Sequence, residues 1–445
     1  MQYKWIVGAL ALSSAVSAHG PMLARRQSPP SNAEDASKLK GGYSKECKQY
    51  GDDNLVKMKG KQLPEASQIA SIVKGDSEAN DLWNEIKKDL PKNVKVKPGT
   101  NNNMGIDQSF QQKYDKSDPD CWWTYNKCTK PKAKNIPQDL DNCPEPSTWG
   151  LTFDDGPNCT HNEFYDFLQQ KKLRATLFYI GTNVMNWPYQ AQRGIADGHD
   201  VCVHTWSHHY MTTLQDEQVF AELYYTAKII KTVLGVTPRC WRPPFGDVDD
   251  RVRAIAAGLG LRTILWQEDT NDWELQEGKV SKDDIENNYE KIINKAKSES
   301  PVVLTHELTG DTMSMFQTEY PKISKGFKNV APLTACFNVT NPYPEDITYP
   351  DFKAFTGGEV DPKGKPDITK VKVDPKAKFS AVPLSKQTEA GTYMKPGKGE
   401  DKSDSKGGGG GSSSDSGDGK SGAASLKASL TLFASAAAIA AIAFL

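Results

Sequence analysis

Two short segments of the sequence contain the side chains best suited to chemistry. The first holds the adjacent carboxylates Asp154 and Asp155, and the second, about fifty residues later, holds His204 and His208. Histidines four residues apart lie on one side of the chain where the backbone turns helically. Two neutral imidazoles and one carboxylate form a three-ligand zinc site with a position left open for water. The second carboxylate is then free to act as a base, so the pattern predicts metal-assisted hydrolysis.

Three later segments also combine polar and aromatic residues. Arg-Pro-Pro-Phe-Gly begins at Arg242, Asp-Thr-Asn-Asp-Trp ends at Trp273, and Leu-Thr-His-Glu begins at Leu304. Taken singly, the first segment is also compatible with a proline-bent surface loop. The second is compatible with a capped loop, and the third with a structural histidine. Their common placement in the chain gives them more weight than any one of them carries alone.

The elements that must position these residues begin at about residue 146, where strand-like and helix-like runs alternate. Repeated β–α units predict an α/β fold with a parallel sheet or barrel, and barrel enzymes place their chemistry at the carboxyl ends of the strands. Asp154-Asp155, His204, Arg242, Asp269 and His306 all follow expected strands. Strands are expected at 149–153, 175–180, 201–203, 240–242, 263–266 and 301–304, and helices at 162–171, 188–196, 216–234, 251–257 and 283–296.

Together, the five segments resemble the motifs of the NodB-homology polysaccharide deacetylases, carbohydrate esterase family 4, and most of all its fungal GPI-anchored chitin deacetylases. The resemblance covers about residues 146–340. It implies a distorted (β/α) barrel of the NodB-homology type that removes acetyl groups from a polysaccharide with the help of a divalent metal. Zinc is the expected metal, with cobalt as an alternative.

The resemblance also assigns the two reacting groups and the metal ligands. It implies that Asp155, His204 and His208 hold the metal. Asp154 would be the catalytic base that takes a proton from water, and His306 the general acid that protonates the leaving amine.

Further residues acquire supporting roles through the same resemblance. Arg242 would align Asp154, and the backbone N–H of Phe245 would stabilise the oxyanion. Asp272 would orient His306, although Asp269 could share that role. Trp273 and Leu304 would line the acetyl pocket. The remaining histidines named here fit no ligand spacing: His161 is expected at a helix start, and His199 and His209 are expected to be structural or exposed to solvent.

The ends of the chain carry address signals. Residues 1–18 are typical of a signal peptide, and residues 421–445 of a GPI-attachment signal with Ser421 as the attachment site. A simple tail anchor is the alternative for the second. We therefore expect a secreted protein in the cell wall and at the outer face of the plasma membrane, held there by a lipid anchor.

The rest of the chain is expected to flank the catalytic domain of 146–340. Residues 19–145 are expected to form an irregular, disulfide-braced extension with helices at 65–73 and 80–90, and residues 341–420 a low-complexity linker. Eight cysteines in a secreted chain favour disulfides, with a connectivity that spacing leaves open. Asn158 and Asn338 begin N-glycosylation sequons, of which the second is the better candidate.

The predicted function is metal-dependent removal of N-acetyl groups from chitin or chito-oligosaccharides, giving chitosan and acetate. The formal net charge of -1 gives no general attraction to nucleic acid, which is not an expected partner. A monomer is expected. The alternatives are a catalytically silent protein that binds cell-wall glycan and a deacetylase of another acetylated polysaccharide.

Overall fold

The computed structural model of the chain describes residues 29–48, 50–278, 280–387 and 391–393. The predicted signal peptide, the GPI-attachment signal with Ser421 and the Gly/Ser-rich stretch at 398–422 lie outside the described residues. Among the described residues, no helix combines the length and the apolar character needed to span a membrane.

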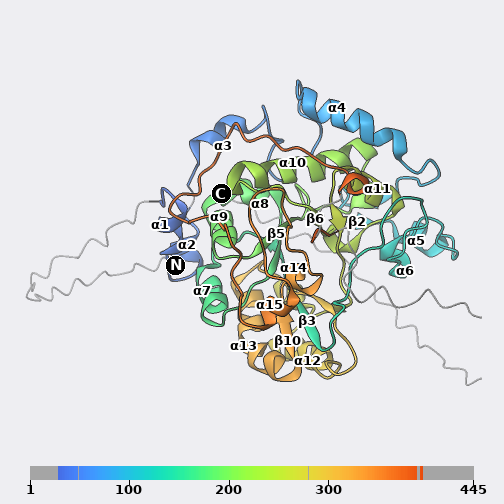
Figure 1. The fold of residues 1–445 in the computed structure, drawn as a ribbon. Coiled ribbons are helices and arrows are strands. Elements are labelled where there is room, and N and C mark those ends of the chain that lie inside the picture. Colours follow the sequence, from blue (N-terminus) through green and yellow to red (C-terminus); the bar gives the residue numbers. More distant parts are fainter. Residues whose placement is uncertain (1–28, 49, 279, 388–390, 394–445) are drawn as a thin grey trace, which may run out of the picture.

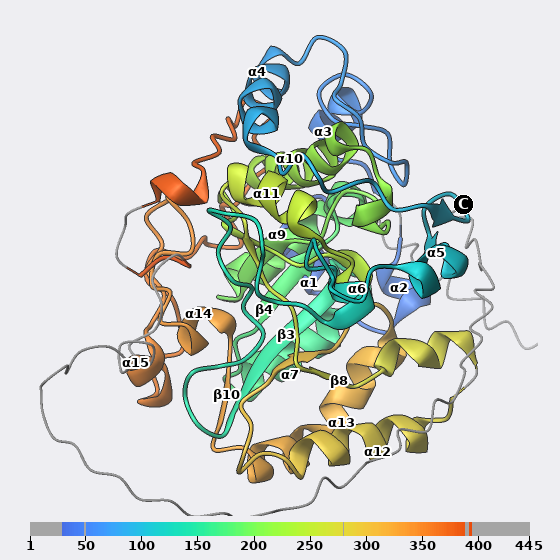
Figure 2. The same ribbon diagram turned by 90° about the vertical axis from the view of Figure 1, so that its right-hand side faces the viewer.

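A parallel sheet forms the centre of the molecule (Figures 1 and 2). Its strands have the order β7-β6-β5-β4-β3-β9-β8, and β10 pairs with the amino end of β3. The two ends of this order are joined by residues 264–267 and are not paired with each other. This arrangement confirms the predicted α/β, distorted-barrel fold. The strands are β3 (Thr148–Gly156), β4 (Thr176–Tyr179), β5 (Asp200–Val203), β6 (Cys240–Trp241), β7 (Arg262–Thr263), β8 (Glu268–Asp269), β9 (Val302–Leu304) and β10 (Asn329–Ala331).

Helices follow the strands and cover the sheet, as Figure 2 shows around β3 and β4. The longest, α10, begins with a capping box between Gln215 and Gln218 and ends at Gly235, whose φ of 77° suits a left-handed cap. The helices of this part are α7 (Asn162–Gln170), α8 (Gly181–Asn186), α9 (Pro188–Ala196), α10 (Asp216–Leu234), α11 (Asp250–Gly258), α12 (Lys282–Ile293), α13 (Gly310–Gly326) and α14 (Leu333–Cys336), with the 3-10 turns η2 (Met211–Thr213), η3 (Pro244–Gly246) and η4 (Asp272–Glu277).

The N-terminal extension packs onto the same core. Leu55, Leu63, Trp83 and Trp123 belong to the hydrophobic cluster that also contains the strands, and α4 lies over α10 in Figure 1. The extension contains α1 (Ala33–Ser37), α2 (Tyr43–Glu46), α3 (Asp53–Met58), α4 (Ser77–Ile86), η1 (Lys87–Asp89), β1 (Gly99–Thr100), β2 (Gly105–Ile106), α5 (Gln108–Lys113) and α6 (Trp123–Asn126).

The helix expected at 65–73 is wrong, whereas the one expected at 80–90 is confirmed by α4 and η1. Residues 65–73 run across α10 without forming a helix. The Ala70 N–H donates to Glu222 and the Val73 N–H donates to the Tyr225 hydroxyl. These backbone groups thus find partners on α10, so a helix is not needed to satisfy them.

Residues 341–387 do not have the character of a flexible linker, which corrects the start expected for that segment. Tyr343, Ile347, Tyr349 and Phe379 are buried in the main core. The Val201 N–H donates to the Tyr343 hydroxyl, and the Tyr349 hydroxyl donates to the carbonyl of His199. The segment also contains α15 (Phe352–Thr356) and η5 (Leu384–Lys386).

The eight cysteines form four disulfides, and all of them lie in the described part of the chain. One joins the extension to the loop after β3, one closes a short loop in the extension, and two brace the barrel. The pairs are Cys47–Cys159, Cys121–Cys128, Cys143–Cys336 and Cys202–Cys240.

Candidate metal and catalytic site

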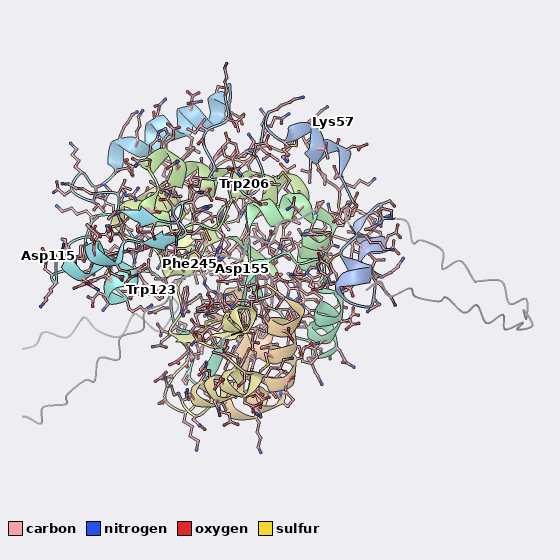
Figure 3. The ribbon with its side chains drawn as sticks, turned by 180° about the vertical axis from the view of Figure 1, so that it is seen from behind. Lys57, Asp115, Trp123, Asp155, Trp206 and Phe245 are labelled. Carbon is pink, nitrogen blue, oxygen red and sulfur yellow. A yellow bond between two sulfur atoms is a disulfide. The ribbon has the colours of Figure 1, made fainter. Side chains whose placement is uncertain are left out.

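Asp155, His204 and His208 converge at the carboxyl ends of β3 and β5. Their potential ligand atoms all lie within 4.8 Å of one another. The Oδ1 atom of Asp155 is 3.3 Å from Nε2 of His204 and 3.1 Å from Nε2 of His208. Figure 3 places Asp155 near the middle of the molecule, beside Phe245. The structure therefore brings together the three residues expected to hold a metal.

The backbone between the two histidines is a loop, and not the helical turn that would also place them on one side. Thr205 and His208 have φ angles of 64° and 56°, in the left-handed region. The buried carboxylate of Glu222 accepts hydrogen bonds from the N–H groups of Trp206 and Ser207 and from the Ser207 hydroxyl, at 2.6–2.8 Å. Glu222 thus holds the loop in the shape that turns both imidazoles toward Asp155.

The chemistry of this donor set fits a cation. The Nδ1 atom of His204 is 2.8 Å from the carbonyl oxygen of Arg242, so in the neutral ring Nδ1 carries the proton and Nε2 keeps a lone pair. That lone pair faces the buried Oδ1 of Asp155. Burial alone would raise the pKa of Asp155, but the two imidazoles hold it well below its ordinary value. A carboxylate and imidazole lone pairs that converge in a buried setting are the ligand types that a divalent cation such as zinc takes.

Asp154 is held separately from Asp155. Its Oδ1 accepts a hydrogen bond of 2.7 Å from Nη1 of Arg242, which also donates to the Thr152 hydroxyl. The guanidinium is fully buried and lies over the rings of Phe178 and Trp266, at 4.1 and 5.7 Å. A buried ion pair of this kind fixes the orientation of the carboxylate. The second oxygen of Asp154 lies 3.9 Å from Nε2 of His204, beside the metal cluster.

His306 is paired with Asp272, as expected. Its Nδ1 is 2.6 Å from Oδ1 of Asp272, and its backbone N–H donates to the other carboxylate oxygen. Burial by itself lowers the pKa of His306, but the carboxylates of Asp272, Asp155 and Asp154 together outweigh burial and raise it to about 10, with Asp272 contributing most. Asp269 instead accepts from the N–H of Asn271, and burial raises its pKa to about 6. The described contacts thus place Asp272, and not Asp269, as the partner of the imidazole.

Backbone pairing sets His306 against Asp154. The Asp154 N–H donates to the carbonyl of Thr305, and the Glu307 N–H donates to the carbonyl of Asp154. This bridge places the expected acid and the expected base on neighbouring strand ends. Gly156 lies next to the pair, where a Cβ atom would overlap the buried carboxylate of Glu307. A residue with a side chain at 156 would therefore disturb the strand that carries both aspartates.

Phe245, Leu304 and Trp273 lie around the same rim. The ring of Phe245 is 39% exposed, stacks on Tyr210 at 4.2 Å and lies 4.7 Å from the His208 ring. Leu304 is buried at the end of β9, and Trp273 is half-buried on η4 directly after Asp272. These positions are compatible with an apolar wall beside the reacting groups.

Among the described residues, His161, His199, His209 and the two sequon asparagines lie outside this cluster. His161 precedes α7, as expected, and His161, His199 and His209 are all buried, so the alternative of solvent exposure is wrong for the last two. The Nδ2 atom of Asn158 donates to the carbonyl of Leu308. The side-chain oxygen of Asn338 accepts from the N–H of Phe352.

Two supporting residues were not found from the sequence. Glu222 shows a weak signal, because it is a charged residue within the apolar face of the 216–234 helix. Trp123 shows none: it belongs to the extension, and its ring packs where a Cβ of Gly246 would lie. Figure 3 shows Trp123 on the side of Phe245 away from Asp155. The extension therefore supports the loop that carries Phe245.

Comparison with known proteins adds a family to this geometry. Residues 141–264 match the family model described as polysaccharide deacetylase. Chitin deacetylase 2 of Cryptococcus neoformans var. grubii is 46% identical over 346 residues, covering 76% of this chain and 75% of that protein. The chitin deacetylase of Amylomyces rouxii is 49% identical over 238 residues, covering 52% of this chain and 56% of that protein.

A solved structure gives a further match. The chitin deacetylase of Colletotrichum lindemuthianum is 26% identical, covers 45% of this chain and 91% of its own, and has a TM-score of 0.41. The likeness to the Cryptococcus protein reaches well beyond the residues that the family model matches.

Proposed function

The chain belongs to the polysaccharide deacetylase family, and we propose that it removes N-acetyl groups from chitin, releasing acetate and leaving glucosamine units. Water adds to the acetyl carbon, the amide C–N bond breaks, and the nitrogen gains a proton. The observation that carries this proposal is a spare carboxylate, Asp154, beside three converging ligand atoms and opposite a charged histidine. The names of its relatives support chitin as the substrate.

Asp155, His204 and His208 are the proposed ligands of a divalent metal. Zinc suits two imidazoles and a carboxylate best, and cobalt is the alternative. When bound, the ion supplies a Lewis acid that polarises the acetyl carbonyl and makes a water molecule more acidic. The contact between His204 Nδ1 and the Arg242 carbonyl supports this assignment, because it keeps Nε2 available to a metal.

Asp154 is the proposed general base. Its ion pair with Arg242 presents one oxygen to the guanidinium and leaves the other directed at the cluster. That second oxygen can accept the proton of the attacking water. The ion pair with Arg242 keeps the carboxylate in one orientation, so the base is already positioned for the reaction.

His306 is the proposed general acid. An amide nitrogen must be protonated as it leaves, because an amine anion is too poor a leaving group. Asp272 fixes the ring through Nδ1 and keeps it protonated, so Nε2 carries the proton that is transferred. The backbone N–H of Phe245 is proposed to donate to the developing oxyanion, and Trp273 and Leu304 to enclose the acetyl methyl group.

The setting of the enzyme is part of the proposal. We propose a secreted monomer, carried by a lipid anchor at Ser421 on the outer face of the plasma membrane and acting in the cell wall. The boundaries 1–18, 19–145, 146–340 and 421–445 remain a proposal, and the linker is proposed to begin only after residue 393, because Tyr393 is buried in the fold. Asn338 is the better candidate for glycosylation, because the Asn158 amide nitrogen already donates to the backbone.

Acetate release from N-acetylated chito-oligosaccharides by the purified protein tests the function. We expect acetate from the wild type, loss of that activity with a chelator, and recovery with zinc. Asp154→Asn should lower kcat by about 100-fold or more, because general-base catalysis contributes about 10²–10⁴, while it still binds metal. Oligosaccharide binding without acetate, under all metal conditions, would instead support the glycan-binding alternative.

A further inference from the structure

We propose that a groove lined by the N-terminal extension binds sugar units of the same glycan chain, away from the acetyl group that is being removed. This inference rests on the proposed function. The groove is a cavity of about 610 Å³ between the extension, near α3, and the end of α8. Volumes of about 300–1,000 Å³ are typical of ligand sites. Its lining includes Tyr50, Asp52, Val56, Ser67, Asn186 and Trp187.

The groove is linked to the site through α8. Asn183, in the middle of this helix, donates to the backbone carbonyl of the metal ligand Asp155. Asn186, one turn later, lines the groove, and three helical residues rise only about 4.5 Å. The residue that holds the Asp155 carbonyl and a residue of the groove wall therefore belong to the same short helix.

The opposite wall is tied to the metal loop. The Ser67 N–H donates to the hydroxyl of Thr182, and that hydroxyl donates to the carbonyl of Trp206, between the two histidine ligands. The indole N–H of Trp206 donates to the carbonyl of Glu65. Both walls of the groove are thus hydrogen-bonded to segments that carry metal ligands.

A disulfide fixes the groove covalently to the same site. Cys47 is bonded to Cys159, which follows Asp155 in the loop after β3. Tyr50, three residues after Cys47, begins the wall of the groove. The extension is therefore held in one place relative to the reacting groups, as a binding surface for a second part of the substrate requires.

The walls have the chemistry of a carbohydrate site. Tyr50 stacks on Tyr189 at 4.5 Å and meets Trp187 edge-on at 6.0 Å. The Tyr50 hydroxyl bonds to Gln190 and accepts from the Tyr189 N–H, so the ring is fixed before any ligand arrives. Aromatic walls pack against the C–H faces of pyranose rings, while polar side chains bond to hydroxyl and acetamido groups.

Charge in the groove favours an uncharged chain. Asp52 is its acidic residue, and its basic residue, Lys59, lies 3.3 Å from Glu65. No excess of positive charge is therefore available for an anionic polymer. Val56 adds an apolar patch that is 66% exposed. A chain of N-acetylglucosamine units, which is neutral and amphipathic, matches this lining.

A substitution on the exposed wall tests the groove. Val56→Arg places a long charged side chain in the groove without touching the core. Val382→Arg is the matched control, since Val382 is 41% exposed and lies near Gly260, outside the groove. We expect Val56→Arg to lower the ratio of kcat/KM for the acetylated hexamer to that for the dimer at least threefold. The control should keep the wild-type ratio.

Calorimetric titration of the hexamer into Asp154→Asn protein, with and without Val56→Arg, provides a second measurement that does not need turnover. We expect Val56→Arg to weaken hexamer binding at least threefold. An unchanged ratio and unchanged binding would overturn the groove while leaving the deacetylase intact. If the wild type released no acetate from any oligomer, the proposed function would fail, and the binding measurement alone would decide the groove.

Discussion

Two neighbouring aspartates take different roles because their surroundings differ. Asp155 faces two imidazoles, whereas Asp154 faces a buried guanidinium. Two carboxylates at adjacent positions would otherwise repel each other and share one proton. Separate partners give the two carboxylates different tasks, because one is available to a metal and the other to a proton. The same principle applies to His306, whose charge depends on Asp272.

Replacing Asp272 tests this dependence. A general acid must be protonated, and His306 is protonated at pH values below its pKa. Against the opposing effect of burial, Asp272 is the main contributor, with Asp155 and Asp154, to raising that pKa to about 10. Asp272→Asn removes the charge, so the pKa falls and the acid is lost at lower pH. We expect the alkaline limb of the kcat profile to move down by roughly one pH unit or more.

Asp269→Asn is the control for this experiment. Asp269 is also nearby and is half-buried, but its side chain accepts from the Asn271 N–H and not from His306. The alkaline limb of the kcat profile of Asp269→Asn should move much less than that of Asp272→Asn. Equal shifts in the two variants would contradict the pairing of His306 with Asp272.

At the scale of residues, the types of side chain in the site were predictable from the sequence, but the backbone conformation that positions them was not. The five segments contain every side chain of the cluster, because the chemistry requires those types at strand ends. The sequence could not decide between Asp269 and Asp272, since both lie within the same short segment. The spacing argument for His204 and His208 depended on a helical turn, whereas positive φ angles at Thr205 and His208 bring them together.

At the scale of elements, the metal loop depends on α10. The buried carboxylate of Glu222 accepts hydrogen bonds from Ala70, Trp206 and Ser207. One side chain therefore fixes both the loop with the histidines and the segment at 65–73. Outer hydrogen bonds of this kind affect metal affinity although they never touch the metal.

Glu222→Gln should weaken this arrangement. In the glutamine side chain, an NH2 group replaces one of the carboxylate oxygens. This NH2 group faces backbone N–H groups that donated to the carboxylate, so these buried donors lose their acceptor. We expect a loss of about 2–3 kcal/mol in stability and zinc binding about 10–100-fold weaker. Thermal unfolding and zinc titration measure the two effects. Glu217→Gln, at an exposed position of the same helix, should change neither, and wild-type zinc affinity in Glu222→Gln would refute the role of this residue.

The elements that the sequence predicted best are helices that the local spacing of apolar residues is enough to define. The helices at 188–196 and 216–234 were predicted with the bounds observed for α9 and α10. The helix expected at 65–73 failed because α10 supplies hydrogen-bond partners that the local sequence does not reveal. Helix α13 was not predicted, and it contains Pro321, which ordinarily ends a helix.

At the scale of the whole molecule, both flanking segments belong to the folded body. The sequence placed 341–420 in one linker because lysine, proline and glycine are frequent there. Residues 341–387 nevertheless bury Tyr343, Tyr349 and Phe379 against the barrel. Composition alone could not reveal this packing, since the apolar partners lie far away in the sequence.

Truncation separates the packed part from the remainder. Each buried aromatic side chain that is lost costs about 3–5 kcal/mol, and whole domains are stable by only about 5–15 kcal/mol. A chain ending at residue 340 should therefore fail to show a cooperative thermal transition. A chain ending at residue 393 should melt like the chain that continues to residue 420. Equal melting temperatures for the 340 and 393 chains would show that the segment does not stabilise the fold.

Zinc titration of the metal-stripped protein, followed in parallel by calorimetry and by acetate release from chito-oligosaccharides, tests the central claim most directly. We predict one zinc ion per chain, activity that recovers in proportion to the zinc bound, and loss of both in Asp155→Ala and His204→Ala. Full activity in protein shown to contain no metal, or wild-type zinc binding in both variants, would contradict the account.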